Sequence, residues 1–216
     1  MGAKRCLATA SGTTALITAL QVMGVDAGDE VLVSPYTFIA SYNVIFAHKA
    51  LPVFVDSDPE TFLLNPAKIE ERITESTTAI IPVHIYGLPV DMDSVNAVAR
   101  RHNLKVVEDA CQAWLAEYRG KKTGTLGDLG CFSFQNSKHL AAGEGGAILG
   151  NDDDIIDMCH AYHNCGRPYG NMKRIPGNPH NGMNYRMQQS QAIILMSQMK
   201  RIEKDNEIRY QNAMYL

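Results

Sequence analysis

One lysine stands out among the residues whose types could do chemistry. Lys138 follows an apolar segment, 131–134, and a polar turn, and it precedes small residues and the glycines of 143–146. Glycine lets a backbone approach a bound group closely. A lysine with its ordinary pKa of about 10.4 is a poor nucleophile at neutral pH, and burial or a bond to a carbonyl group changes this. The segment fits a reactive amine, and it also fits a solvated surface lysine.

An acid at the end of a second apolar run is the next chemical feature. Asp109 directly follows the segment 104–108, where a carboxylate could cap a helix, bind a metal ion or pair with a ring nitrogen. No histidine stands at a spacing suited to metal binding, so no metal site is predicted. Gln112 follows Asp109 by about one helical turn, so we expect its side chain on the same side.

A glycine turn near the N-terminus is a third candidate. Ser11, Gly12 and Thr13 lie between an expected strand at 5–10 and an expected helix at 15–23. Free backbone N–H groups and the helix dipole make such a turn an anion site. Simple capping of the helix by Ser11 or Thr13 is the alternative. The turn is neither a Walker A loop nor a GxGxxG motif, which counts against a nicotinamide dinucleotide-binding domain.

Several other side chains have both a structural and a functional interpretation. Phe38 follows an expected strand at 30–34, where it could stack on a planar ring or lie in the core. Ser133 could donate to a phosphate or bond to the backbone, and Asn184 could simply cap a loop. His84 and Tyr86 could touch a substrate, although a histidine bonded at the sheet edge is favoured.

Strand and helix patterns alternate along the chain, which favours an α/β sandwich with a mainly parallel sheet. The expected strands are 5–10, 30–34, 51–56, 78–85, 104–108, 131–134 and 147–149. The expected helices are 15–23, 39–48, 66–74, 91–102, 152–163 and 188–215. Segment 114–124 reads as a surface hairpin or loop, and 166–182 as an irregular loop.

Composition places the 216-residue chain among ordinary globular proteins. The net charge of -3 gives no reason to expect a nucleic-acid or membrane-surface partner. Neither a signal peptide nor a run long enough to span a bilayer is evident. The cysteines are scattered and odd in number, which indicates reduced thiols in a cytoplasmic protein: Cys6, Cys111, Cys131, Cys159 and Cys165.

Four motifs together resemble the fold type I pyridoxal-phosphate (PLP) enzymes, and more narrowly the sugar aminotransferase family of the DegT/DnrJ/StrS type. They are SGTTAL at 11–16, VVEDACQA at 106–113, SFQNSKHLAAGEGG at 133–146 and GMNYRM at 182–187. The resemblance implies a three-layer α/β/α sandwich with a mainly parallel seven-stranded sheet. That is the large domain of the aspartate aminotransferase-like transferases.

The same resemblance implies a role for each candidate. Lys138 would bond the aldehyde of pyridoxal 5'-phosphate and, once released, act as the general base, and Asp109 would keep the ring nitrogen protonated. Gln112 would contact the ring oxygen and Phe38 the ring face. The phosphate would be held by Gly12, Thr13, Ser133 and Asn184. Asn184 would come from the partner chain, which makes a homodimer with shared active sites.

The implied reaction moves an amino group from glutamate or glutamine to a nucleotide-linked keto sugar, with ping-pong kinetics. In dehydratases of this family a histidine replaces the lysine, and His139 is adjacent to Lys138. The position that bonds the cofactor lies five residues after Ser133 and six before Glu144. Both counts give Lys138 and not His139, which favours the aminotransferase. Aminohydroxybenzoate synthases, keto-inositol aminotransferases and a non-enzymatic relative stay open as alternatives.

Family members of this kind are longer than this chain. We therefore expect residues 1–186 to form the PLP-binding large domain, and 187–216 to form a long helix that leads to a small C-terminal domain.

Overall fold

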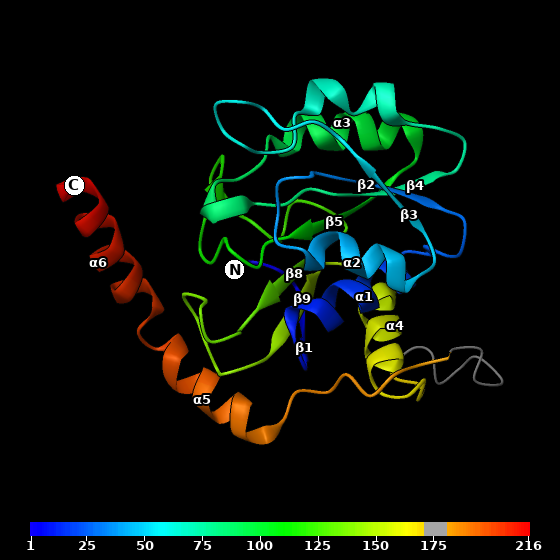
Figure 1. Cartoon of the computed structure of the whole chain (residues 1–216). Helices are drawn as coiled ribbons and strands as arrows, with labels where there is room; N and C mark the ends of the chain where they lie inside the picture. Colours follow the sequence, from blue (N-terminus) through cyan, green and yellow to red (C-terminus); the bar gives the residue numbers. More distant parts are fainter. Residues whose placement is uncertain (171–180) are drawn as a thin grey trace.

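A mainly parallel sheet runs through the centre of the protein, for which the computed structural model describes residues 1–170 and 181–216 (Figure 1). Its strands in chain order are β1 (Arg5–Thr9), β2 (Glu30–Val33), β3 (Leu51–Phe54), β4 (Thr77–Ile81), β5 (Lys105–Asp109), β8 (Leu129–Ser133) and β9 (Gly146–Gly150). Across the seven-stranded sheet the order is β1-β9-β8-β5-β4-β2-β3, and within the described residues β9 alone runs against the others. The predicted sheet is confirmed.

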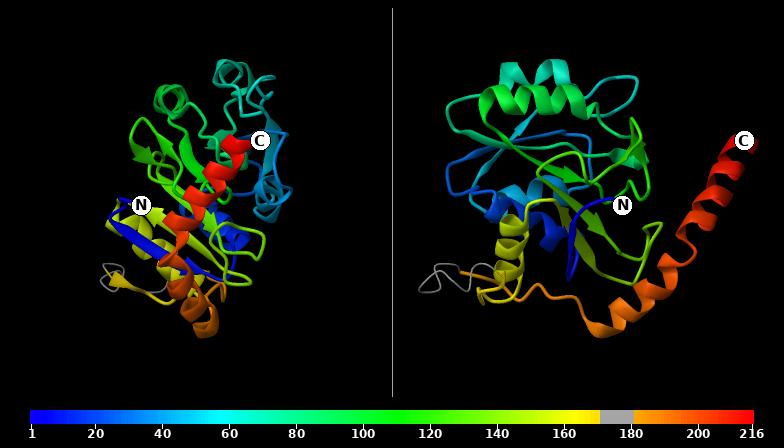
Figure 2. Two further views of the ribbon diagram at one scale, coloured as in Figure 1. Left: turned by 90° about the vertical axis from the view of Figure 1, so that its left-hand side faces the viewer. Right: turned by 180° about the vertical axis from the view of Figure 1, so that it is seen from behind.

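Helices cover both faces of this sheet, which confirms the three-layer sandwich (Figures 1 and 2). The helices on one face are α1 (Gly12–Val22), α2 (Ala40–Ala47) and α4 (Asp153–His163), and α3 (Met92–His102) lies on the other. Successive residues of a strand point to opposite faces, so Val31 and Val33 pack on the first side and Leu32 on the second. Burial on both faces explains the continuous apolar runs of these strands.

The expected helix at 188–215 is interrupted. It consists of α5 (Gln189–Met199) and α6 (Ile202–Tyr215), separated by a tight turn in which the Arg201 N–H donates to the Gln198 carbonyl at 3.0 Å. The break allows Leu195 and Ile202 both to pack against the body, where each is at most 9 % exposed. Much of the rest of the two helices is exposed, and they run along the outside of the domain (Figures 1 and 2).

Two further predictions need correction. Segment 66–74 forms two short 3-10 turns, Pro66–Lys68 and Glu70–Arg72, because Ile73 has an extended backbone that ends the helical path. The strand expected at 78–85 ends at Ile81, since Pro82 has no N–H to donate to the sheet.

The segment 114–124 contains the predicted hairpin, β6 (Glu117–Tyr118) paired with β7 (Lys121–Lys122). Trp114 is nevertheless half-buried. Its ring lies 4.3 Å from that of Phe132 and 5.2 Å from that of Phe134 by centroids, and it packs against the core cluster that contains these two residues.

The centre of the irregular loop expected at 166–182 lies outside the described residues, at 171–180. Among the residues that are described, no helix has both the length and the apolar character needed to cross a membrane.

Candidate active site

A cavity of about 350 Å³ opens where the carboxyl ends of β1, β2, β5 and β8 meet. Ligands of open α/β sheets bind at this edge. Most of the candidates line this one cavity, although they come from four separate segments of the chain: Gly12, Thr13, Phe38, Asp109, Gln112, Ser133 and Lys138.

The N-terminus of α1 supplies backbone donors to the cavity. Ser11 caps the helix, because its side chain accepts the N–H of Thr14 while the Thr14 hydroxyl accepts the N–H of Ser11. The N–H groups of Gly12 and Thr13 find no acceptor among the described residues. The capping interpretation is confirmed for Ser11, and the N–H groups of Gly12 and Thr13 are left available to an anion.

Glycine is required at position 12 by the space around it. A Cβ atom there would lie 2.8 Å from Cβ of Ser133 and 3.0 Å from Sγ of Cys111. Gly146 of β9 is equally constrained, because a Cβ there would meet the carbonyl oxygen of Ser11. The turn of α1 therefore packs directly on the end of β8 and β9.

Gly12→Ala is expected to weaken PLP binding about tenfold or more, because overpacking that costs about 1–3 kcal/mol would push the turn away from Ser133. A titration of the protein with PLP, followed by absorbance, gives the dissociation constant. Thr13→Ala is the control, because it keeps the backbone N–H and adds no atom. If Thr13→Ala weakens binding as much as Gly12→Ala, backbone recognition of the anion is wrong.

The Asp109 carboxylate is only 6 % exposed, and both of its oxygens accept hydrogen bonds. The Ser41 hydroxyl donates to Oδ2 at 2.8 Å, and the backbone N–H of Cys111 donates to Oδ1 at 3.1 Å. Ser41 Oγ in turn lies 2.8 Å from Thr37 Oγ1. An ionised carboxylate has about four acceptor positions, so Asp109 can still accept a donor from the cavity.

The neighbouring acid has a structural role. Glu108 is fully buried, and its oxygens accept from three backbone N–H groups at 2.6 to 2.7 Å: Gly124, Leu126 and Gly127. His84 Nε2 lies 2.9 Å from Glu108, and His84 Nδ1 accepts the N–H of Val90 at 3.1 Å. Nδ1 thus carries no proton, and Nε2 is the donor. This confirms the interpretation of His84 as a histidine bonded at the sheet edge.

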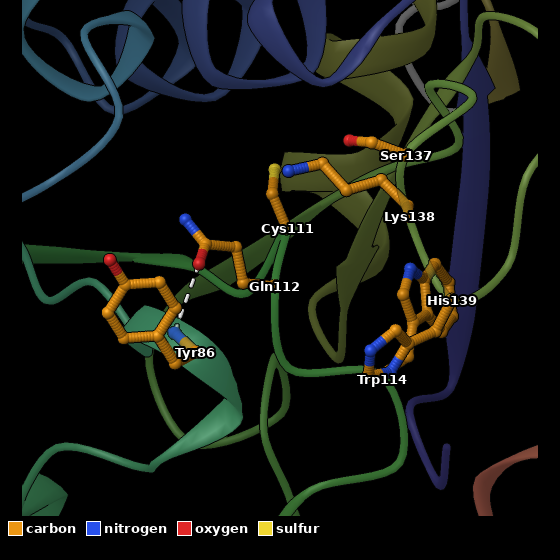
Figure 3. A pocket seen from close by; sticks show the side chains of 7 residues that line it. All are labelled: Tyr86, Cys111, Gln112, Trp114, Ser137, Lys138 and His139. Atoms are coloured by element: carbon orange, nitrogen blue, oxygen red, sulfur yellow. Dashed lines mark hydrogen bonds between the residues drawn. The ribbon is translucent and has the colours of Figure 1, made fainter. Parts of the chain in front are cut away.

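The amide of Gln112 is oriented by an unusual backbone. Tyr86 has φ 53° and ψ 18°, in the left-handed region that bulky residues rarely adopt. Its N–H donates to Oε1 of Gln112 at 3.0 Å, which leaves Nε2 as the free donor (Figure 3). Gln112 can therefore donate to an oxygen of a bound group.

Lys138 and Phe38 face each other across the cavity. Lys138 Nζ lies 5.9 Å from the centroid of the Phe38 ring. Phe38 is 63 % exposed, which excludes the core role considered for it. Ser133, at the end of β8, is buried, and its hydroxyl also accepts the N–H of Gln135 at 3.3 Å. His139 does not line this cavity, whereas Lys138 does.

Cys111 also lines this cavity, and its sulfur lies beside the Lys138 amine (Figure 3). Burial first, and then the negative charge of Asp109, raise the pKa of the Cys111 thiol well above its ordinary value. The thiolate is the form that reacts with electrophiles, and a raised pKa removes it at mild pH.

We therefore expect iodoacetamide at pH 8 to alkylate the exposed Cys165 well before Cys111. Peptide mass spectrometry over a time course measures both rates in one sample. Equal rates for the two cysteines would contradict the protonated, shielded thiol.

Asn184, predicted to act in the partner chain, is exposed, pairs through its backbone with Asn164 and does not line the cavity of its own chain. Sequence reasoning missed Ser41 and Thr37, although two hydroxyl residues four apart at the start of a helix were a usable signal.

The cavity fits pyridoxal phosphate. For a phosphate it offers the backbone N–H groups of Gly12 and Thr13 and the hydroxyl of Ser133. For the ring it offers the Asp109 carboxylate to the nitrogen, the Gln112 amide to the oxygen and the Phe38 side chain to one face. Lys138 provides the one amine. The volume is within the usual range of about 300–1,000 Å³ for small-molecule sites.

Known proteins resemble the whole chain. It is 47% identical over 203 residues to GDP-perosamine synthase of Caulobacter vibrioides, covering 94% of this chain and 54% of that protein. It is 42% identical over 215 residues to the dTDP-3-amino-3,6-dideoxy-alpha-D-galactopyranose transaminase of Aneurinibacillus thermoaerophilus, covering 99% and 58%. The chain thus spans little more than half the length of these curated relatives.

A solved structure from Bacillus subtilis, with the cofactor PMP bound, superimposes with a TM-score of 0.83 at 33% identity, covering 93% of this chain and 45% of that one. The model of the DegT/DnrJ/EryC1/StrS aminotransferase family matches residues 1–216. On its motifs, its fold and these similarities, the chain belongs to the DegT/DnrJ/EryC1/StrS aminotransferase family.

Proposed function

We propose that this chain carries the cofactor site of a PLP-dependent aminotransferase that moves an amino group from glutamate or glutamine to a nucleotide-linked keto sugar. The observation that supports this best is one cavity lined by Lys138, Asp109 and the free amides of α1. The two curated relatives, named as a synthase and a transaminase of nucleotide-linked amino sugars, support the choice of acceptor.

Two groups of residues bind the phosphate and the ring nitrogen of the cofactor. The N–H groups of Gly12 and Thr13 and the hydroxyl of Ser133 hold the phosphate, where the α1 dipole favours negative charge. Asp109, oriented by Ser41, holds a proton on the ring nitrogen. When bound, pyridoxal phosphate supplies an electron sink for the bonds that break at the substrate carbon.

Acid–base work falls to Lys138. Its amine would hold the cofactor through the aldehyde carbon, and when free it would act as the general base for the proton of the substrate α-carbon. Phe38 covers one face of the ring and excludes water from it, while Gln112 Nε2 donates to the ring oxygen. No other lysine of the described residues lines this cavity, so a second amine does not compete for these tasks.

An absorbance spectrum of the protein mixed with PLP tests this function. Cofactor bound to a lysine absorbs at longer wavelength than pyridoxamine phosphate, so glutamate or glutamine should shift the band and a keto sugar should restore it. No band, or a band that no amino donor moves, would overturn the aminotransferase. If a sugar substrate loses water while glutamate and glutamine leave the absorbance band unchanged, the dehydratase would be favoured.

We further propose that residues 1–186 act as the PLP-binding domain of a cytoplasmic homodimer, with 187–216 leading to a further domain. Asn184, which is exposed and does not line its own cavity, is suited to reach the phosphate in the partner chain. Mixing a Lys138→Ala protein with an Asn184→Ala protein tests the shared site. Mixed dimers would regain one intact site, and so part of the activity; mixed dimers that stay inactive would contradict the sharing.

A further inference from the structure

A second cavity of about 270 Å³ adjoins the first, and Figure 3 shows the side chains that line it. Four residues line both cavities: Cys111, Gln112, Ser137 and Lys138. The remaining walls of the second cavity are Tyr86, Trp114 and His139, which the cofactor roles above leave unused. Figure 3 shows Tyr86 on one side of this space and Trp114 with His139 on the other.

We propose that this second cavity receives the sugar ring of the acceptor, with His139 bonding a ring hydroxyl and Trp114 forming a fixed apolar wall. The proposal rests on the aminotransferase function proposed above and names the residues that decide which ring is accepted.

The division of residues between the two cavities supports this assignment. The phosphate-binding groups, Gly12, Thr13 and Ser133, line the first cavity and not the second. Lys138 and Gln112 line both, and they are the residues proposed to meet the reactive edge of the cofactor. A substrate carbon must come next to Lys138 on the side that the cofactor leaves free, and the second cavity opens there.

Both ring nitrogens of His139 are available for hydrogen bonds to a ligand. Its side chain is exposed, and neither ring nitrogen has a hydrogen-bond partner among the described residues, so both can bond a ligand or water. Partial burial first, and then the charges of Arg209 and Lys138, lower the pKa of His139 from its ordinary value, which favours the neutral ring. A neutral imidazole has one donor and one acceptor, which matches a hydroxyl group.

Trp114 is held in place before any ligand arrives. Its indole N–H donates to the carbonyl of Ser133 at 3.2 Å, its ring stacks on Phe134 at 25°, and its carbonyl accepts from Asn206 of α6 at 3.3 Å. On the opposite side, the Tyr86 hydroxyl lies 3.0 Å from that of Tyr36. A rigid aromatic wall with polar groups around it suits a ring that has both C–H faces and hydroxyl groups, and fixing it in advance lowers the cost of binding.

The test uses the protein loaded with PLP and two probes, GDP-perosamine and dTDP-3-amino-3,6-dideoxygalactose, whose amino groups would drive the reaction in reverse. The rate of the absorbance change is measured against probe concentration. For the better probe, we expect His139→Ala to raise the half-saturating concentration about tenfold, the effect of one lost hydrogen bond. His139→Gln keeps a donor and an acceptor and should recover most of the loss.

Three controls make the result specific. Conversion by glutamate, which has no ring hydroxyl, should change less than twofold in His139→Ala. Inhibition by the free nucleoside diphosphate should also stay within twofold, since only the sugar ring is assigned to this cavity. His102→Ala, at an exposed position of α3, should change nothing.

The outcomes separate the two proposals. A wild type that reacts with neither glutamate nor the sugar probes would overturn the aminotransferase itself. A wild type that reacts with glutamate alone, or a His139→Ala variant with an unchanged half-saturating concentration, would overturn the assignment of the cavity.

Discussion

Lys138→Ala is expected to lower amino transfer by at least about 10³-fold and to abolish covalent attachment of the cofactor. Lys138 is the lysine that lines the cavity in the described part of the chain, and its amine lies over the Phe38 ring. Treatment of the wild-type protein with PLP and borohydride should fix the cofactor to one peptide, and mass spectrometry should locate it at Lys138. The variant should give no labelled peptide.

Lys68→Ala is the matched control, because Lys68 is an exposed lysine that pairs with Glu71 on a surface turn and does not line the cavity. It should label and react as the wild type does. Labelling of another lysine in wild-type protein, or a Lys138→Ala variant that retains activity, would contradict the role of this amine.

Asp109→Asn is expected to lower amino transfer roughly 10²–10³-fold while the fold is retained. The amide has nearly the same shape: its oxygen can still accept the Cys111 N–H, and its NH2 group can donate to the Ser41 hydroxyl oxygen. It carries no negative charge to keep a ring nitrogen protonated, so the electron sink weakens. Rates with glutamate and the dissociation constant of PLP should be measured together, with circular dichroism to verify folding.

Ser41→Ala is a second variant with a smaller expected effect, since it removes one of the two hydrogen bonds that orient Asp109 and leaves the negative charge of Asp109 in place. We expect a loss of about tenfold, because a hydrogen bond to a charged group contributes about 1.5–3 kcal/mol. Ser41→Thr should restore most of it. An Asp109→Asn protein as active as the wild type would show that this carboxylate does not act on the cofactor.

The sequence by itself predicted the sheet and most of the residues that line the cavity. Strand segments that alternate with helices predicted parallel connections, and parallel strands bring their carboxyl ends to one edge. Gly12, Asp109 and Ser133 each follow or end such a strand, so they meet although the chain between them is long. The family motifs added the roles that residue patterns left open.

Predictions were less accurate where a choice depended on packing. The break between α5 and α6 lets Leu195 and Ile202 both reach the body, and no local breaker residue announces it. Trp114 lies in a segment that reads as a surface loop, yet its ring is stacked against Phe132 and Phe134. Helical periodicity and loop composition report local preference, whereas these features come from contacts with distant residues.

The two adjacent acids show most directly what tertiary structure decided. Glu108 and Asp109 are both carboxylates at the end of one strand, and adjacent strand residues face opposite ways. Only the folded chain shows that Glu108 meets three backbone N–H groups of another loop, while Asp109 meets Ser41, 68 residues away, and the cavity. The sequence determined which groups could react; long-range contacts determined which of them face one another, because a side chain's partners are set by the whole fold.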